Sequence, residues 1–103
     1  MKRYRLTPQA SDDLFQIWSY IARDSIEAAN AVEEAVYEAC SLVANGPMRG
    51  HIRKDLTRLP LRFWTVQPYR NYIIVYDPAS EPLAITRILH GARNVAALLR
   101  EPR

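Results

Sequence analysis

The fold is decided by the stretch that spans residues 61–90, LRFWTVQPYRNYIIVYDPASEPLAITRILH. Three runs rich in β-branched and aromatic residues, 61–66, 71–77 and 83–90, are separated by the turn signals QPYR and PASEP. The middle run is apolar nearly throughout, as a strand in the centre of a sheet should be. Three sequential strands joined by short loops favour an antiparallel meander.

Upstream of these strands, the apolar residues recur with the period of a helix. The segment RYRL, at residues 3–6, alternates polar and apolar side chains and predicts a short first strand. Thr7 then supplies an N-cap, and Pro8 a first helical position at which the missing N–H does no harm. A helix over about 8–23 is predicted by an apolar stripe of Ala10, Leu14, Ile17, Trp18 and Ile21.

A second helix follows after a short link. Its start is marked either by a capping box between Asp24 and Glu27 or by Ser25 as a competing cap. Gly46 and Pro47 end it, the glycine through a left-handed turn and the proline because it cannot continue a helix. Its apolar stripe contains Ala28, Val32, Val36, Ala39, Cys40 and Val43. Two amphipathic helices with a short link predict an antiparallel helical hairpin.

The element order β-α-α-β-β-β predicts an α+β fold in which the helical hairpin covers one face of an antiparallel sheet. The segment NVAALLR, at residues 94–100, adds a short C-terminal helix. The chain has 103 residues, near the commonest domain size, so we expect a single domain over residues 1–103.

Charge is distributed unevenly along the chain. Residues 1–46 hold four Lys/Arg and seven Asp/Glu, whereas residues 47–103 hold ten Lys/Arg and four Asp/Glu. Such asymmetry suggests either an acidic partner surface or nucleic acid, the alternative being an ordinarily solvated surface. The single cysteine, Cys40, rules out a disulfide within the chain and fits a reducing compartment. No signal core or membrane-length apolar run is present, so we expect a cytoplasmic protein that does not contact a membrane.

Several kinds of catalytic or metal chemistry find little support. His51 and His90 are the only histidines, and neither has a second ligand type at a useful spacing. The three glycines are too far apart for a phosphate-binding loop. Paired carboxylates such as Asp12 and Asp13 are expected on solvated helix faces. We therefore expect neither a metal nor a cofactor.

Arginines are the strongest candidates for function, because guanidinium groups bind phosphate and carboxylate in a fork geometry. One group crowds the central loop and another lies on or beside the strands: Arg49, Arg53, Lys54 and Arg58, then Arg62, Arg70, Arg87 and Arg93. Aromatic side chains between them either stack on bases or fill the two faces of the sheet. After the last strand, His90 either carries a proton or fixes the corner, and Gly91 either takes a positive φ or allows close packing. Arg93 is expected to clamp nearby carbonyls or a carboxylate.

Four segments, taken together and in order, resemble the ParE toxins of the RelE/ParE superfamily. They are LTPQASDDLFQIWSYIARDS, ANGPMRGHIRKDL, LRFWTVQPYRNYIIVYD and ITRILHGARN. The resemblance covers about residues 6–100, and its most specific part is RILHGAR following a strand of the YIIVYD kind. The β-α-α-β-β-β order agrees with the fold of that family.

This resemblance implies the toxin of a type II toxin–antitoxin system, which inhibits DNA gyrase and is held inactive by a ParD-like antitoxin. It implies a protein that acts by binding and not as an enzyme, without sequence-specific DNA binding of its own. An acidic, apolar antitoxin segment would occupy a groove beside the arginine-rich sheet. Candidate antitoxin- or target-binding residues are Trp18, Ile21, Arg58, Arg62, Arg87, Arg93, Leu98 and Leu99. For the two leucines, the alternative is that they close the core.

The other branch of the superfamily offers the alternative of a ribosome-dependent mRNA endoribonuclease. In that branch, basic residues and a tyrosine or histidine on the sheet carry out acid–base cleavage, and His90, Arg93 and Arg87 would be the catalytic candidates. The chain departs from the nuclease pattern, because the strand after Tyr72 reads IIVY where such nucleases usually carry an arginine. A module that binds an antitoxin without being toxic is a third possibility. The missing arginine favours inhibition by binding.

Overall fold

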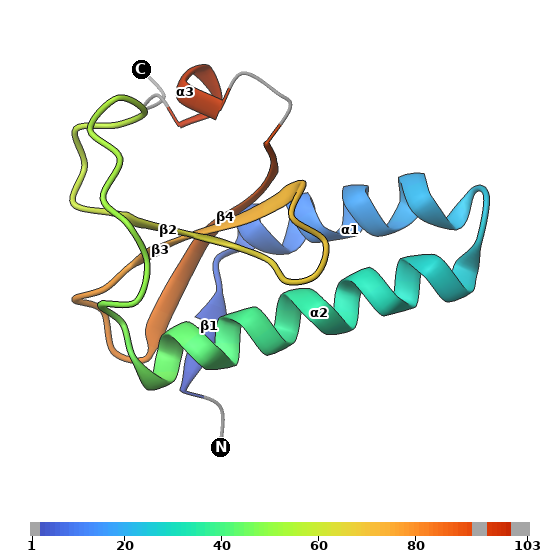
Figure 1. The fold of residues 1–103 in the computed structure, drawn as a ribbon, viewed down its shortest axis with the longest axis horizontal. Coiled ribbons are helices and arrows are strands. Elements are labelled where there is room, and N and C mark those ends of the chain that lie inside the picture. The colour runs from blue at the N-terminus through green and yellow to red at the C-terminus, as the bar shows by residue number, and fades with distance from the viewer. Residues whose placement is uncertain (1–2, 92–94, 100–103) are drawn as a thin grey trace.

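The computed structural model describes residues 3–91 and 95–99, and its helices and strands follow the predicted order (Figure 1). The elements are β1 (Tyr4–Leu6), α1 (Pro8–Ala22), α2 (Ile26–Asn45), β2 (Arg62–Thr65), β3 (Tyr72–Asp77), β4 (Leu83–His90) and α3 (Val95–Leu98). Of the helix expected over 94–100, the structure describes the single turn α3. The two predicted turns connect β2 to β3 and β3 to β4, and each contains a cis peptide bond before a proline.

The four strands form one mixed sheet, in the order β1-β4-β3-β2. Strands β2, β3 and β4 form the predicted antiparallel meander. The expectation of a wholly antiparallel sheet was wrong, because β1 pairs with β4 in parallel. The helical hairpin returns the chain to the end from which β1 started, so β2 runs in the same direction as β1. Two further reversals then make β4 parallel to both.

Each long helix begins at a hydroxyl cap. The Thr7 side chain accepts a hydrogen bond from the N–H of Ala10 at 3.1 Å, and Pro8 follows at the first helical position, as predicted. At the start of α2, the Ser25 hydroxyl accepts from the N–H of Ala28 at 3.0 Å. Of the two caps that the sequence left open, the structure therefore uses Ser25.

Replacing Ser25 with alanine is expected to lower the free energy of unfolding by about 1 kcal/mol, the typical value of an N-cap. The cost arises because the N–H of Ala28 loses its acceptor. Asp24→Ala is the matched control, expected to cost only a few tenths of a kcal/mol, since Asp24 is exposed and is not the cap. Urea unfolding of both variants measures the difference, and an equal loss in the two would show that a capping box operates in solution.

The end of α2 differs from expectation. Gly46 caps the helix, but with φ −151° and ψ 80° it is not in the left-handed region. The residue that precedes a proline is pushed towards extended conformations, and Pro47 follows directly. The proline therefore stops the helix, and a left-handed glycine is not required there.

The main core lies between the helical hairpin and one face of the sheet. From the sheet it receives mainly Ile74, Tyr76, Ile85 and Ile88, and all four are buried. The stripe predicted on α2 is buried apart from Ala28, which is exposed; the next residue along the chain takes its place. Helical periodicity therefore located the covered face to within one residue.

A second, smaller cluster covers the opposite face of the sheet. It contains Phe63, Val75, Leu89, Val95 and Leu99, with leucines of the loop before β2 packed against it. A register shift gives β4 one extra residue opposite Val75 and Tyr76 of β3. Because of this bulge, Arg87 and Leu89 share the face of Val75, where a regular strand would have turned them towards the helices.

Candidate functional site

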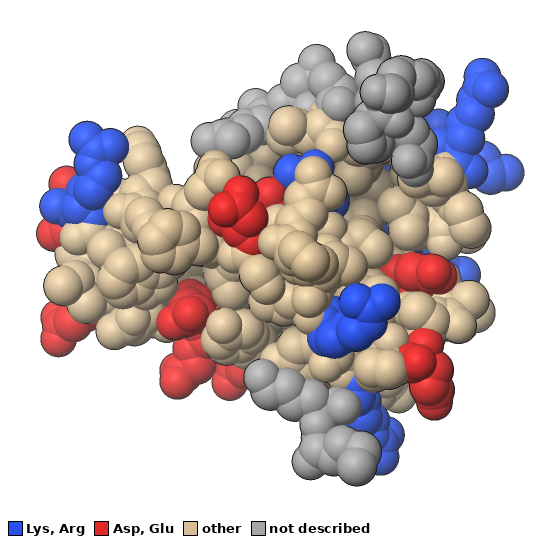
Figure 2. Space-filling model, turned by 180° about the vertical axis from the view of Figure 1, so that it is seen from behind, with Lys and Arg blue, Asp and Glu red and all other residues tan. Residues whose placement is uncertain are grey.

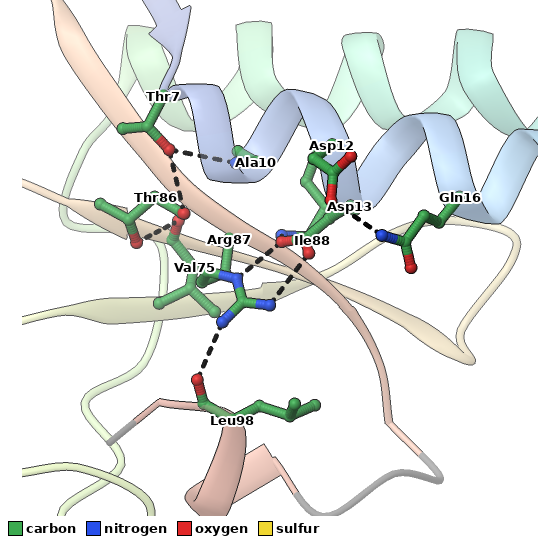
Figure 3. Close-up of polar contacts among 10 residues, drawn as sticks. All are labelled: Thr7, Ala10, Asp12, Asp13, Gln16, Val75, Thr86, Arg87, Ile88 and Leu98. Carbon is green, nitrogen blue, oxygen red and sulfur yellow. Dashed lines mark hydrogen bonds and ion pairs between the residues drawn. The ribbon is translucent and has the colours of Figure 1, made fainter. Parts of the chain in front are cut away.

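Arg87 and Asp13 form a partly buried ion pair between β4 and α1 (Figure 3). Nε of Arg87 donates to Oδ2 of Asp13 at 2.7 Å, and Nη2 donates to Oδ1 at 2.9 Å. The two side chains are 14% and 13% exposed, so the expectation that Asp13 is solvated was wrong. Asp13 faces the part of β4 that β1 leaves uncovered. The hydrogen bonds to Asp13 raise the pKa of Arg87, which keeps the guanidinium charged.

The same pair is tied to the backbone of two elements. Oδ2 of Asp13 also accepts from the N–H of Ile88 at 3.0 Å, beyond the point at which β1 ends. Nη1 of Arg87 donates to the carbonyl of Leu98 in α3 at 2.8 Å. Three of the five guanidinium N–H groups are thus engaged within the protein. Arg87 and Asp13, with the backbone groups that they bind, form a polar cluster that joins α1, β4 and α3. The role of Arg87 in this cluster is structural.

Arg62 and Arg58, two further candidate binding residues, differ from Arg87 in their surroundings. Arg62 on β2 donates from Nη1 to the carbonyl of Gly50 at 2.6 Å and, at 3.4 Å, to that of Met48. Arg58 is exposed on the loop before β2. Strand β3 separates Arg62 from Arg87, so the structure does not gather these arginines into one site.

The end of β4 forms a packed corner. His90 meets its strand partner Tyr72 edge-on, with ring centroids 5.2 Å apart. The next N–H, of Gly91, donates to the carbonyl of Asn71 at 2.6 Å. Gly91 has no positive φ, and a Cβ there would lie 3.3 Å from Cδ1 of Ile73, so close packing is the alternative that holds. This geometry favours the corner-fixing role of His90. Arg93 lies outside the described residues.

Trp18 and Ile21, expected on the apolar stripe of α1, are both partly buried. Nε1 of Trp18 donates to Oδ1 of Asn30 on α2 at 2.9 Å, which fixes the indole between the two helices. Ile21 packs against the main core. Trp18 therefore reaches a surface, whereas Ile21 mainly supports the hairpin.

The surface that Trp18 reaches is a groove of about 390 Å³ between α1, α2 and β1. It is lined by Leu6, Ser11, Leu14, Phe15, Trp18, Asn30, Glu33 and Tyr37. Phe15 is 66% exposed, which is unusual for so large an apolar side chain. At the rim, the hydroxyl of Tyr37 donates to Oε2 of Glu33 at 3.4 Å, and burial together with Glu33 raises the pKa of Tyr37. The groove has an apolar floor and a negative rim.

This groove does not lie where the sequence placed one. The antitoxin groove expected beside the arginines stays a prediction, whereas this groove lies on the acidic half of the chain, at the β1 edge of the sheet. Sequence reasoning also missed Phe15, since this residue falls outside the core stripe of α1. The available signal was a second stripe at helical spacing, Ser11, Phe15 and Trp18, on the neighbouring face of the helix.

The two C-terminal leucines have different roles. Leu99 is 8% exposed and belongs to the second core cluster. Leu98 is 36% exposed, and its carbonyl is the acceptor for Arg87. Leu99 therefore closes the core, and Leu98 presents a side chain at the surface.

Within residues 3–91 and 95–99, no group of three or more His, Cys, Asp or Glu side chains is placed to hold a metal ion. In the same part of the chain, no helix is both long enough and apolar enough to cross a membrane.

Comparison with known proteins shows similarity to a family model and to solved structures. The family model described as the ParE toxin of the type II toxin–antitoxin system parDE matches residues 4–95. Among solved structures, the chain is similar to one titled "Chromosomal ParDE TA system from P. aeruginosa", with a TM-score of 0.68 and 20% sequence identity. The similarity covers 87% of this chain and 96% of that one, and at this identity it shows the fold. No curated protein matches the chain.

Proposed function

The chain belongs to the ParE toxin family of type II toxin–antitoxin systems, and we propose that it inhibits DNA gyrase by binding and is neutralised by a ParD-like antitoxin. It acts in the cytoplasm as a protein without catalytic residues and without sequence-specific DNA contacts of its own. The family and the fold support the toxin assignment. The choice of gyrase follows the resemblance to ParE toxins in the ordered sequence motifs.

One observation favours a toxin that binds its target over one that cleaves RNA: the arginines on the strands donate their hydrogen bonds to groups of the protein itself. RNA cleavage needs cations that face the scissile phosphate and stabilise its developing charge. Arg87 donates to Asp13 and to a backbone carbonyl, and Arg62 donates to the carbonyl of Gly50. Removing Arg87 from these partners would leave the Asp13 carboxylate without its counter-charge. This arrangement suits a scaffold that presents surfaces to other proteins.

The antitoxin is assigned to the groove between α1, α2 and β1. A groove whose floor is lined by large apolar side chains, with Phe15 left two-thirds exposed, has the character of a surface covered in a complex. An amphipathic antitoxin segment would place apolar side chains against Trp18 and Phe15. A basic side chain of the same segment would lie near Glu33 at the rim.

A supercoiling assay tests the proposed target. Purified toxin is added to gyrase and relaxed plasmid, and we expect loss of supercoiling that antitoxin restores. In parallel, translated messages from cells that express the toxin are analysed by primer extension. Cuts at codon positions together with normal supercoiling would establish the endoribonuclease in place of the gyrase inhibitor.

The groove assignment predicts a specific escape variant. Phe15→Ala should weaken antitoxin binding about 30-fold, the effect of losing a central aromatic contact worth about 2 kcal/mol. Gyrase inhibition should be unchanged, so this variant stays active when antitoxin is present. Titration calorimetry with purified antitoxin gives the affinity.

Tyr20→Ala is the matched control. Tyr20 is also an aromatic residue of α1 and is 70% exposed, but it does not line the groove. The two variants should therefore be equally stable, and only the Phe15 variant should lose antitoxin affinity. Equal affinity of both variants for the antitoxin would show that the antitoxin binds elsewhere.

A further inference from the structure

The loop that joins α2 to β2 exposes large apolar side chains. Met48 is 69% exposed, Ile52 55% and Leu59 38%. Single exposed apolar residues are common, but three within twelve residues of one loop form a local concentration. Such a surface is characteristic of a place where a partner protein binds.

The same loop carries four basic side chains. Arg49, Arg53, Lys54 and Arg58 are all exposed. The one acidic residue among them, Asp55, already accepts two hydrogen bonds from Arg53, at 2.9 and 2.7 Å. The basic loop surface is defined as Met48, Arg49, Ile52, Lys54, Arg58 and Leu59. It combines apolar contact area with cations that form no ion pair with an acidic side chain among residues 3–91 and 95–99. In Figure 2 blue side chains project at the upper right, on the side of the loop, with red side chains below them, while both red and blue side chains lie over the helical hairpin on the left.

Internal contacts hold this loop in place. The Tyr76 hydroxyl donates to the carbonyl of Pro47 at 2.7 Å and accepts from the N–H of Gly50 at 2.8 Å. His51 and Phe63 exchange two backbone hydrogen bonds of 2.8 Å, which fasten the loop to the outer edge of β2. A loop ordered in advance loses little conformational entropy on binding, so its exposed side chains are available for contact at low cost.

We propose that the basic loop surface is a second docking surface, separate from the antitoxin groove, which binds an acidic, apolar segment of a partner protein. Carboxylates of the segment pair with Arg49, Lys54 and Arg58, and its apolar side chains cover Met48, Ile52 and Leu59. The positive charge of the loop fits an acidic partner and repels a basic one. A partner bound here does not compete with a partner in the groove, because β1 and β2 are opposite edges of the sheet.

The apolar component distinguishes a protein segment from nucleic acid. A phosphodiester backbone is bound by cations and polar groups, and it gains little from three exposed aliphatic side chains. An acidic amphipathic helix or strand uses both components of the surface. The two kinds of partner therefore respond differently when the charges and the apolar side chains are changed separately.

The test uses the whole chain and two probes, a synthetic 20-residue amphipathic peptide with glutamates on one face and leucines on the other, and a 20-base-pair DNA duplex. Binding is measured by fluorescence anisotropy at low salt. The charge variant is Arg49→Glu/Lys54→Glu/Arg58→Glu, and the apolar variant is Met48→Ser/Ile52→Ser/Leu59→Ser. The matched control is Arg3→Glu/Arg5→Glu/Arg23→Glu, which changes the net charge equally at exposed positions outside the surface. Thermal melting confirms that each variant is folded.

We expect the charge variant to weaken peptide binding at least tenfold and the apolar variant at least fivefold, with the control triple close to the original chain. Equal loss in the charge variant and the control would overturn the proposal, since any three cations of the chain would then serve. Tighter binding of the duplex than of the peptide, unaffected by the apolar variant, would assign the surface to nucleic acid instead. Neither probe involves gyrase or antitoxin, so this result is independent of the outcome for the proposed function.

Discussion

Replacing Arg87 with methionine is expected to lower the free energy of unfolding by about 3 kcal/mol, the lower end of the cost for a buried pair, since removing one partner of this partly buried ion pair strands the other charge. Asp13, which is 13% exposed, would lose both of its bonds to the guanidinium, and the carbonyl of Leu98 would lose its donor. The variant would therefore also loosen α3 from the sheet. Urea denaturation followed by circular dichroism measures the loss.

The chain contains a matched control at the same distance. Arg53 lies 2.7 Å from Asp55, as Arg87 lies from Asp13, but these side chains are 47% and 62% exposed. Arg53→Met should cost less than about 1 kcal/mol, because water screens an exposed pair. Equal losses in the Arg53 and Arg87 variants would show that burial adds nothing to the inner pair. In that case the Arg87–Asp13 pair would have no structural role, and Arg87 would again be a candidate for contact with a partner protein.

A double replacement separates the role of charge from that of volume. Arg87→Met with Asp13→Leu removes both charges and keeps apolar bulk between α1 and β4. Such replacements are often neutral, so we expect the double variant to recover most of the stability lost in Arg87→Met. If it stays as unstable as the single variant, the hydrogen bonds to Ile88 and Leu98 are the main contribution of the cluster.

The regular elements could be predicted because their signals are local. The strand runs and turn signals of residues 61–90 and the apolar stripes of the two helices each depend on near neighbours in the sequence, and the structure confirms the meander and the helical hairpin. The parallel pairing of β1 with β4 could not be inferred in the same way. It joins Tyr4 to Leu83 and depends on how the hairpin returns the chain.

The surroundings of individual side chains were harder to predict. Asp13 and Arg87 are 74 residues apart in sequence, and Arg87 reaches its position because of a one-residue bulge in β4. A bulge has no simple sequence signal, yet it exchanges the two faces of a strand. The groove was missed for a similar reason, because Phe15 on one helix and Tyr37 on the other line it together only once the helices have packed. The candidate surfaces therefore depend on contacts between elements that are distant in the sequence, and such contacts leave no local sequence pattern.

The second large effect is expected at Gly50, where alanine should lower the free energy of unfolding by about 3 kcal/mol through overpacking. A Cβ at this position would lie 2.5 Å from the Tyr76 hydroxyl oxygen, 2.9 Å from Cε1 of the same ring and 3.0 Å from the carbonyl oxygen of Phe63. Tyr76 is completely buried, and burial raises its pKa, so its protonated hydroxyl is held where it bonds the loop. Neither the ring nor the backbone of β2 has room to move away.

Gly91→Ala is the control for this prediction, and its free energy of unfolding should lie within about 0.5 kcal/mol of that of the original chain. Gly91 has no positive φ, and the nearest atom to its added Cβ, Cδ1 of Ile73 at 3.3 Å, ends a side chain that can adjust. Thermal melting compares the two variants. If Gly50→Ala proves as stable as Gly91→Ala, the loop can move away from Tyr76 without a cost in stability. The basic loop surface would then not be held rigidly by this contact. If Gly50→Ala is unstable while Tyr76→Phe/Gly50→Ala regains part of the loss, the contact with the tyrosine hydroxyl is what sets the position of the loop.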